Sequence, residues 1–264
     1  MLNITPDSFS DGGNFLSVPL AMDRAATMLD EGADVIEVGG ESTRPGARSV
    51  SASEEADRVL PVVRAIVKRW PHTPVAVDTV KSAVAEAALS AGASIVNDVS
   101  ALRLDERISK VCAARGATLI LMHSRGSVED MASYERADYP DGAASAVVRE
   151  LGAAAMLAVG AGVDPARIIL DPGLGFSKRS AHSVEVLANV PLLLELGFEV
   201  MIGASRKRFI GELTGVSNAT GRVAGTVGAN VVALTLGASW FRVHDIRPNR
   251  EALDVAFGIL EARA

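Results

Sequence analysis

Three cations and a hydroxyl group follow one short apolar run in the second half of the chain. The run, residues 200–202, has the pattern of a buried strand, and the segment 205–208 after it reads SRKR. Phe209 starts the next apolar segment, which predicts a helix beginning there. A solvated basic turn is the commoner structure for such a cluster. A strand-to-helix junction also presents backbone N–H groups and the positive end of a helix dipole, so Ser205, Lys207 and Arg208 are candidates for binding an anion.

Polar side chains end most of the other apolar runs as well. They are Asp78, Asn97, His123 and Asp171, the pair Arg242 and His244, and Thr43 with Arg44 in the segment 39–49. Any one of them is most simply explained as a helix cap or a turn residue. Capping is a poor explanation for so many strands in succession. If the strands are parallel, these side chains share one edge of the sheet, where active sites of α/β proteins lie.

These residues fall into two chemical groups. Paired acceptors and donors suited to the edge of a planar nitrogen heterocycle come from Asp78, Asn97, Asp171 and Lys207. Cationic and polar groups suited to phosphate oxygens come from Thr43, Arg44, Arg242 and His244, together with Asn3. The sequence therefore predicts a heterocycle pocket beside a phosphate clamp.

Alternating apolar runs and helical patterns position these residues. Strands are predicted at 34–38, 74–78, 94–98, 118–123, 168–171, 200–204 and 239–244, and helices at 21–32, 53–70, 82–90, 106–115, 143–159, 181–196, up to about 236, and 250–262. A loop of turn-forming residues, 2–13, precedes the first helix, and the strand before it is reduced to Met1 and Leu2. The pattern predicts a parallel (β/α)8 TIM barrel whose first strand is truncated or nearly absent, with a doubly wound sheet as the alternative.

Length and composition agree with one such barrel. The chain has 264 residues, 48% of them apolar, and we expect a single domain over 1–264. A net charge of -6 argues against a nucleic-acid or membrane surface. The lone Cys112 lies in an Ala-rich helical pattern, which predicts a packed thiol in a reducing compartment. No apolar run approaches the roughly 20 residues that span a bilayer, so we expect a soluble cytoplasmic protein.

A series of short motifs covers essentially the whole chain: in order, they are LNITPDSFSDGG, GGESTRPGA, VDT, IVNDVSA, LMH, LDPGLGF, GASRK and RVHD. In type, order and spacing they resemble the motifs of the dihydropteroate synthase family of the folate pathway. The resemblance implies a transferase that condenses 6-hydroxymethyl-7,8-dihydropterin diphosphate with 4-aminobenzoate, giving 7,8-dihydropteroate and diphosphate. It also implies a homodimer and a family targeted by sulfonamides; whether this protein is inhibited by them stays open.

The resemblance also implies a role for each matched position. Asp78, Asn97, Asp171 and Lys207 correspond to the pterin pocket, and Thr43, Arg242 and His244 to the diphosphate site, with Asn3 as a ligand of Mg²⁺. The walls of the 4-aminobenzoate pocket correspond to Phe9, Pro45 and Phe176, beside Ser205 and Lys207. The two loops around 7–13 and 42–46 are expected to close over bound pterin diphosphate.

Several positions depart from the family pattern. Arg208 replaces the usual Ser, either strengthening carboxylate binding or pointing to solvent. Ser124 and Ser177 replace a common Met and a Gly, and we expect both to alter the pterin side. The short first strand weakens the expectation that Asn3 is a rigid ligand, and a start upstream of Met1 is one explanation for it. His123 is expected to have only a supporting role.

Three other functions stay open at this point. A pterin-binding methyltransferase would share the Asp and Asn positions but would have no use for Arg242, His244 and the STRPG segment. A non-catalytic pterin-binding paralogue would explain the short first strand. A Schiff-base aldolase would use Lys207 as its nucleophile, with neighbouring arginines lowering the pKa of that lysine.

Overall fold

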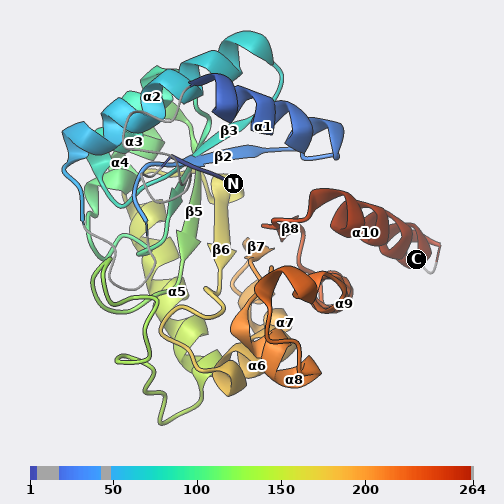
Figure 1. The fold of residues 1–264 in the computed structure, drawn as a ribbon. Coiled ribbons are helices and arrows are strands. Elements are labelled where there is room, and N and C mark those ends of the chain that lie inside the picture. The colour runs from blue at the N-terminus through green and yellow to red at the C-terminus, as the bar shows by residue number, and fades with distance from the viewer. Residues whose placement is uncertain (5–17, 43–48, 263–264) are drawn as a thin grey trace.

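Eight parallel strands form one curled sheet in a computed structural model that describes residues 1–4, 18–42 and 49–262 (Figure 1). Each strand pairs with its neighbours in sequence, from β1 to β8. The strands are β1 (Leu2–Asn3), β2 (Ile36–Gly39), β3 (Val75–Asp78), β4 (Ile95–Asp98), β5 (Thr118–Met122), β6 (Ile168–Asp171), β7 (Glu199–Ile202) and β8 (Trp240–Phe241). The predicted (β/α)8 class is confirmed, and the doubly wound order is excluded.

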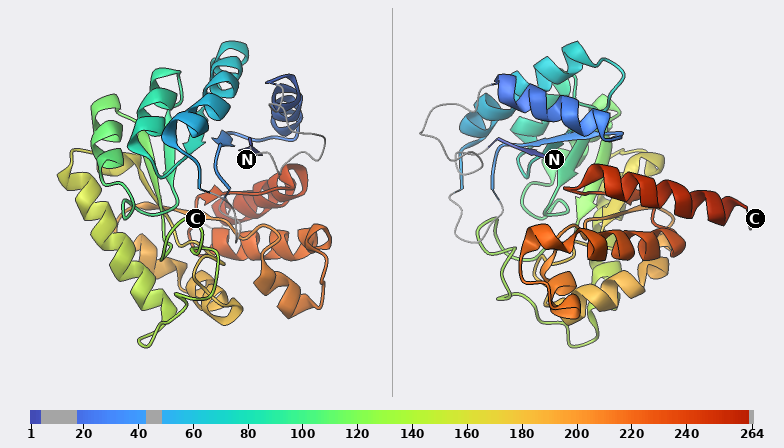
Figure 2. Two further views of the ribbon diagram at one scale, coloured as in Figure 1. Left: turned by 60° about the vertical axis from the view of Figure 1, so that its left-hand side comes forward. Right: turned by 45° about the vertical axis from the view of Figure 1, so that its right-hand side comes forward.

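Helices cover the outside of this sheet, as Figure 2 shows from two further sides. They are α1 (Val18–Asp30), α2 (Ala52–Arg69), α3 (Ser82–Ser90), α4 (Arg107–Arg115), α5 (Ala143–Gly160), α6 (Ser180–Ala188), α7 (Val190–Leu194), α8 (Arg208–Thr214), α9 (Val223–Thr235) and α10 (Ile246–Glu261). Most bounds agree with the predicted ones within a few residues. Each βα unit therefore returns the chain to the same end of the sheet.

Two prolines explain where the predicted helices differ from the observed ones. The predicted helix 181–196 is two helices, α6 and α7, because Pro191 lacks the backbone N–H that a continuous helix would need. The last helix begins at Ile246, although the sequence predicts a start after Pro248. Pro248 lies in the first turn, where its missing N–H would have no partner inside the helix, so the helix can include it.

α2 illustrates how the local sequence fixes a helix. Its N-cap residue, Ser51, accepts a hydrogen bond from the backbone N–H of Glu54 at 3.1 Å. Acidic residues occupy the first turn and basic residues the last, which suits the helix dipole. Val59, Val63 and Ile66 are fully buried against the sheet. The N-terminus of α2, which follows β2 in the chain, is therefore fixed by this cap and by the buried face of the helix.

A small cluster of apolar side chains lies inside the curled sheet. Ala76, Ile95, Ile120, Ile169 and Met201 form this cluster, one residue from each of β3 to β7. They are neighbours across the ladders, where Ala76 pairs with Ile95 and Ile120 with Ile169. Four of them, Ala76, Ile95, Ile120 and Met201, also border an apolar cavity, so the cluster is not closely packed on every side.

The first strand is short, as the sequence predicts. Leu2 pairs with Val38 and Asn3 with Gly39, and the backbone N–H of Ile4 donates to Gly39 at 2.7 Å. Asn3 is thus held by the ladder. Among the described residues no ladder joins β8 back to β1, so the sheet has a seam between its first and last strands. A mostly apolar cavity of about 590 Å³ lies along this seam, bordered by Met1 and Trp240.

One helix among the described residues, α5, is long and apolar enough to cross a membrane by length and composition alone. Its inner face, which includes Val147 and Leu151, is fully buried in the molecule. This face packs into the core of the barrel, and buried core helices commonly pass the same test.

Candidate active site

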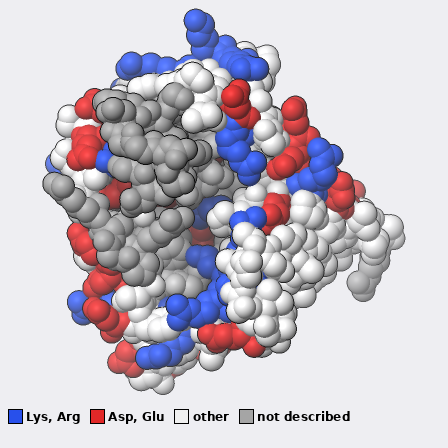
Figure 3. Space-filling model, viewed as in Figure 1, with Lys and Arg blue, Asp and Glu red and all other residues white. Residues whose placement is uncertain are grey.

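A cavity of about 280 Å³ opens at the carboxyl ends of the strands. Predicted site residues that line it are Asn3, Asp78, Asn97, Asp171, Phe176, Ser205, Lys207, Arg242 and His244. Acidic and basic side chains meet in the hollow at the centre of the face drawn in Figure 3. The cavity along the seam is larger but mostly apolar, so its size does not make it the better candidate.

Arg242 follows β8, lines this cavity and joins two carboxylates. Its Nε and Nη2 donate to the two oxygens of Glu37 at 2.7 and 3.1 Å, and its Nη1 donates to Asp171 at 2.8 Å. Burial opposes the charge of Arg242, but Glu37, Asp171 and Asp78 outweigh burial and raise its pKa. Arg242 is therefore a fixed cation, with further N–H groups that a ligand could use.

Asp171 and Asp78 occupy the ends of β6 and β3. Asp171 is buried, and its second oxygen accepts the backbone N–H of Gly173 at 2.8 Å. Burial raises the pKa of Asp78 well above its usual value, and the negative charge of Glu37 adds to this effect, with Arg242 opposing it. A carboxyl group with a raised pKa can donate a hydrogen bond as well as accept one. The pair can thus match both donors and acceptors of a ligand.

Asn97 at the end of β4 is fully buried and lines the same cavity. Both its amide nitrogen and its amide oxygen lack a hydrogen-bond partner among the residues that the structure describes. A buried polar group without a partner costs about 1–3 kcal/mol. An amide left unpaired on a cavity wall is ready to bind a ligand that offers one donor and one acceptor.

Lys207 lies at the N-cap of α8, with its Nζ 4.2 Å from the centre of the Phe176 ring. Burial is the main cause that lowers its pKa to about 8; Asp171 opposes this shift, and Arg242 adds to it. Lys207 is thus a cation with a partly lost charge near neutral pH. It lies between Asp171 and the aromatic wall that Phe176 forms.

Ser205 holds His244 in place beside the cavity. The Ser205 hydroxyl accepts the backbone N–H of His244 at 3.1 Å and lies 2.9 Å from its Nδ1. Burial lowers the pKa of His244, and the charge of Arg206 contributes to the same shift. If Ser205 donates to Nδ1, the ring of a neutral His244 carries its proton on Nε2, which makes it a hydrogen-bond donor without a charge.

The other two cations of the segment 205–208 turn away from the cavity. Arg206 makes a bidentate pair with Asp245, at 2.9 and 2.5 Å. Arg208 is exposed, with its guanidinium carbon 5.1 Å from the centre of the Tyr134 ring. Of the three, only Lys207 lines the cavity. The structure therefore does not bring Arg208 to the other predicted site residues.

Four predicted site residues, Phe9, Thr43, Arg44 and Pro45, lie outside the described residues, as do most of the two loops expected to close. Ser124 and Ser177 do not line the cavity. The Ser124 hydroxyl donates to the backbone of Val99 at 2.6 Å, and Ser177 contacts the backbone of Arg125 and Met131. Their expected effect on the pterin side is therefore not a direct one.

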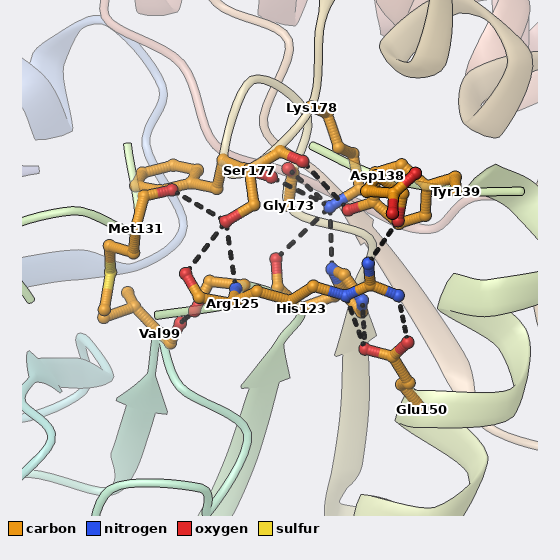
Figure 4. A network of polar contacts seen from close by, with 12 residues as sticks. Val99, His123, Arg125, Met131, Asp138, Tyr139, Glu150, Gly173, Ser177 and Lys178 are labelled. Carbon is orange, nitrogen blue, oxygen red and sulfur yellow. Dashed lines mark hydrogen bonds and ion pairs between the residues drawn. The ribbon is translucent and has the colours of Figure 1, made fainter. Parts of the chain in front are cut away.

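Sequence reasoning missed Glu37. It is buried and supplies both oxygens to Arg242. The signal was a single acidic residue inside the apolar run VIEVG, since a buried carboxylate needs a partner. A second missed group joins Lys178, His123, Glu150 and Arg125 behind the cavity (Figure 4).

Comparison with known proteins identifies the family. The family model described as "Pterin binding enzyme" matches residues 1–244. The chain belongs to the pterin binding enzyme family. It is 41% identical to the dihydropteroate synthase of Synechocystis over 257 residues, which cover 97% of this chain and 87% of that protein.

Two further relatives of this pterin binding enzyme show the extent of the likeness. It is 39% identical to the mitochondrial folate synthesis bifunctional protein of Arabidopsis thaliana, over 100% of this chain but only 49% of that protein. The structure of Xanthomonas albilineans dihydropteroate synthase with 4-aminobenzoic acid superimposes with a TM-score of 0.89 at 42% identity, covering 98% of this chain and 91% of that one. The predicted resemblance is confirmed.

Proposed function

We propose that this pterin binding enzyme is a dihydropteroate synthase. It condenses 6-hydroxymethyl-7,8-dihydropterin diphosphate with 4-aminobenzoate, giving 7,8-dihydropteroate and diphosphate. The relatives named above support the reaction, and the solved Xanthomonas structure contains one of its two substrates. The observation in this chain that carries the proposal is the unpaired amide of Asn97 on a cavity wall that also holds carboxylates and Lys207.

The pterin ring binds at the deep end of the cavity. Asn97 offers one donor and one acceptor, and Asp78 and Asp171 offer further ones on either side. A planar heterocycle with ring nitrogens, an amino group and a carbonyl matches such a set along one edge. Binding therefore satisfies polar groups that are buried and unpaired in the free enzyme, which favours this ligand over an apolar one.

The diphosphate group binds at the rim beside the pterin. Arg242 and His244 border the rim, and Thr43 and Arg44 belong to the segment predicted to complete it. Asn3 lines the same cavity and offers an amide oxygen, the kind of ligand that Mg²⁺ accepts when phosphate oxygens supply the rest. The described residues contain no cluster of three His, Cys, Asp or Glu for a metal. Asn3 would therefore hold Mg²⁺ together with the substrate, and the bound ion would neutralise charge on the leaving diphosphate.

The reaction exchanges one bond for another at the pterin methylene. The bond from this carbon to the diphosphate oxygen breaks, and a bond from the amine nitrogen forms, with loss of one proton from that nitrogen. Arg242 and His244 stabilise the charge that develops on the diphosphate. The carboxylate of Asp171 supplies negative potential to an electron-poor pterin methylene, Asp78 binds the ring by hydrogen bonds, and the site needs no side-chain nucleophile.

The second substrate binds against Phe176 and Lys207. The Phe176 ring is an apolar wall at the mouth of the cavity, and Lys207 lies between this wall and Asp171. A flat aromatic amine fits between the ring and the pterin. Its carboxylate can be met by Ser205 and by the cationic start of α8.

Two of the competing functions fit the structure less well. A methyltransferase would not need Arg242 and His244 at the cavity rim. A Schiff-base aldolase would need a free amine at Lys207, and the amine is packed against the Phe176 ring. A non-catalytic paralogue differs from the enzyme only in turnover, so the assay below decides between them.

Isothermal calorimetry with pterin diphosphate, and then with methyltetrahydrofolate, tests the binding half of the proposal. We expect micromolar or tighter binding of pterin diphosphate, and a loss of about tenfold or more when Arg242 is changed to Gln, since one lost charge-assisted hydrogen bond contributes about 1.5–3 kcal/mol. Equal binding of both ligands by wild type and Arg242→Gln would favour the methyltransferase instead.

We also propose that the protein is a homodimer in the cytoplasm. Exposed apolar side chains on α9 and α10 support an interface there, namely Val232, Val255, Phe257 and Ile259. Sedimentation at micromolar concentration is expected to give twice the mass of one chain, and Phe257→Lys to shift it towards one chain. A monomeric wild type would contradict this part alone.

A further inference from the structure

Lys178 is the largest fully buried side chain of the described residues. A lysine is almost never buried unless its ammonium group is paired. Here Nζ donates to the backbone carbonyls of Phe176 and Gly173 at 3.1 and 3.2 Å, and it lies 2.7 Å from Nδ1 of His123 (Figure 4). The three N–H groups of an ammonium therefore have three acceptors.

This arrangement fixes the tautomer of His123. Because Nδ1 accepts from Lys178, the ring proton is on Nε2, which donates to Glu150 of α5 at 3.0 Å. Burial is the main cause that lowers the pKa of His123 to about 4, and the charge of Lys178 adds to the shift. The ring is thus neutral, as an acceptor for Lys178 must be. Arg125 in turn holds the Glu150 carboxylate through Nε and Nη2.

The two carbonyl groups that Lys178 binds belong to the loop between β6 and α6. The backbone N–H of Phe176 donates to Gly173 at 3.0 Å, which closes a tight turn over residues 173–176. Gly173 has a φ of 64°, and a Cβ added there would lie 1.9 Å from the carbonyl oxygen of His123. The turn therefore packs closely against the end of β5, and the Lys178 side chain binds the carbonyl groups of the first and the last residue of the turn.

The front of the same turn faces the cavity. At its start, Gly173 donates to Asp171; at its end, the Phe176 ring lies against Lys207. Asp171 is also held by strand β6 and by Arg242. The Phe176 ring packs against the apolar cluster that includes Val99 and Met131, but its backbone is fixed by the turn. A change in the turn should therefore move Phe176 more than Asp171.

We propose that Lys178 is a positioning residue for the second substrate, holding the 173–176 turn so that Phe176 forms the wall against which the aromatic amine binds. This inference rests on the proposed function. The Lys178 ammonium touches no part of the cavity itself, and acts through the two carbonyl groups and the His123 ring. Ser177, the residue before Lys178, anchors the same loop through the backbone of Arg125 and Met131.

Steady-state kinetics of Lys178→Met, with both substrates varied, test the proposal. Met keeps most of the side-chain volume but removes the ammonium. We expect the KM for 4-aminobenzoate to rise about tenfold or more, with kcat and the Kd for pterin diphosphate within about threefold of wild type. Lys110→Met is the matched control because Lys110 is exposed on α4, and it should behave as wild type.

A second variant keeps the proposal testable if Lys178→Met does not fold. Glu150→Ala leaves Lys178 in place but frees the His123 ring, and we expect a rise in the same KM of about threefold or more. An unchanged KM for 4-aminobenzoate in the folded variant, or an equal loss in kcat and in both affinities, would overturn the role of Lys178. Absence of turnover in the wild type would refute the proposed function instead.

Discussion

Asn97→Leu should make the free protein more stable while it weakens pterin binding. Both polar atoms of the Asn97 amide are buried without partners in the described part of the free protein, and each such atom costs about 1–3 kcal/mol. Leu has a similar shape and no polar atoms. We therefore expect the free energy of unfolding to rise by about 1–3 kcal/mol, allowing for an imperfect fit of Leu, which corresponds to roughly 2–12 °C in Tm for a large single domain.

The same substitution removes two hydrogen bonds to the bound heterocycle. At about 0.5–1.5 kcal/mol for each bond, and more where the pterin groups are left unpaired, the Kd for pterin diphosphate should rise by about 10- to 100-fold. Thermal melts without ligand and calorimetry with pterin diphosphate measure the two effects on one sample. The opposite signs of the changes in stability and in affinity are the specific expectation.

Asn230→Leu is the matched control for this experiment. Asn230 is also buried with an unpaired oxygen, but its amide nitrogen donates to Asn249 at 2.9 Å between α9 and α10, away from the cavity. Asn230→Leu removes this hydrogen bond and leaves the Asn249 oxygen without a donor, so we expect a lower Tm and an unchanged affinity for pterin diphosphate. A wild-type Kd in Asn97→Leu would refute the reasoning that the unpaired amide marks the pterin site, whatever the change in Tm.

The remaining predictions concern charge and the thiol. Burial lowers the pKa of Lys178 to about 7 and of Lys207 to about 8, against 10.5 for an ordinary lysine. Between pH 7 and 10.5 the unfolded chain therefore binds more protons than the folded chain, so both lysines make the free energy of unfolding rise with pH over this range. Urea titrations at several pH values should show a smaller rise in Lys207→Met than in wild type. An equal rise in both proteins would count against a lowered pKa of Lys207. Glu37→Leu should lower the free energy of unfolding by about 3–5 kcal/mol, because it leaves the buried Arg242 with one carboxylate fewer. Urea denaturation measures this change, and a variant as stable as wild type would show that the ion pair does not stabilise the fold. Burial raises the pKa of Cys112 to about 12, so a thiol reagent should label it only on unfolding, and Cys112→Ala should keep wild-type kcat; rapid labelling of the native protein would contradict this.

The strand ends were the part of the site that the sequence could predict. Alternation of apolar runs and helices fixes which residues end the strands, and Asp78, Asn97, Asp171 and Arg242 all follow from that pattern. The spacing of apolar residues depends only on the neighbouring sequence, so it identifies the strand ends before the packing of the elements is known.

The direction of each side chain in segment 205–208 could not be predicted, because it depends on partners far along the chain. Arg206 turns towards Asp245, 39 residues later, and Arg208 towards Tyr134, 74 residues earlier in the segment between β5 and α5. Lys178 is a similar case, since the acceptors that allow its burial come partly from His123, 55 residues earlier and directly after β5. A lysine in sequence looks exposed until such acceptors are found.

The chemical step itself is tested most directly by following diphosphate release and 7,8-dihydropteroate formation together, with wild-type enzyme, pterin diphosphate and Mg²⁺. The account predicts that both products form in a one-to-one ratio only after 4-aminobenzoate is added, and that Lys207→Met and Arg242→Gln slow both equally. Tight binding of pterin diphosphate by the wild type without diphosphate release in the presence of 4-aminobenzoate would contradict it, and would make the protein a pterin-binding paralogue without this activity.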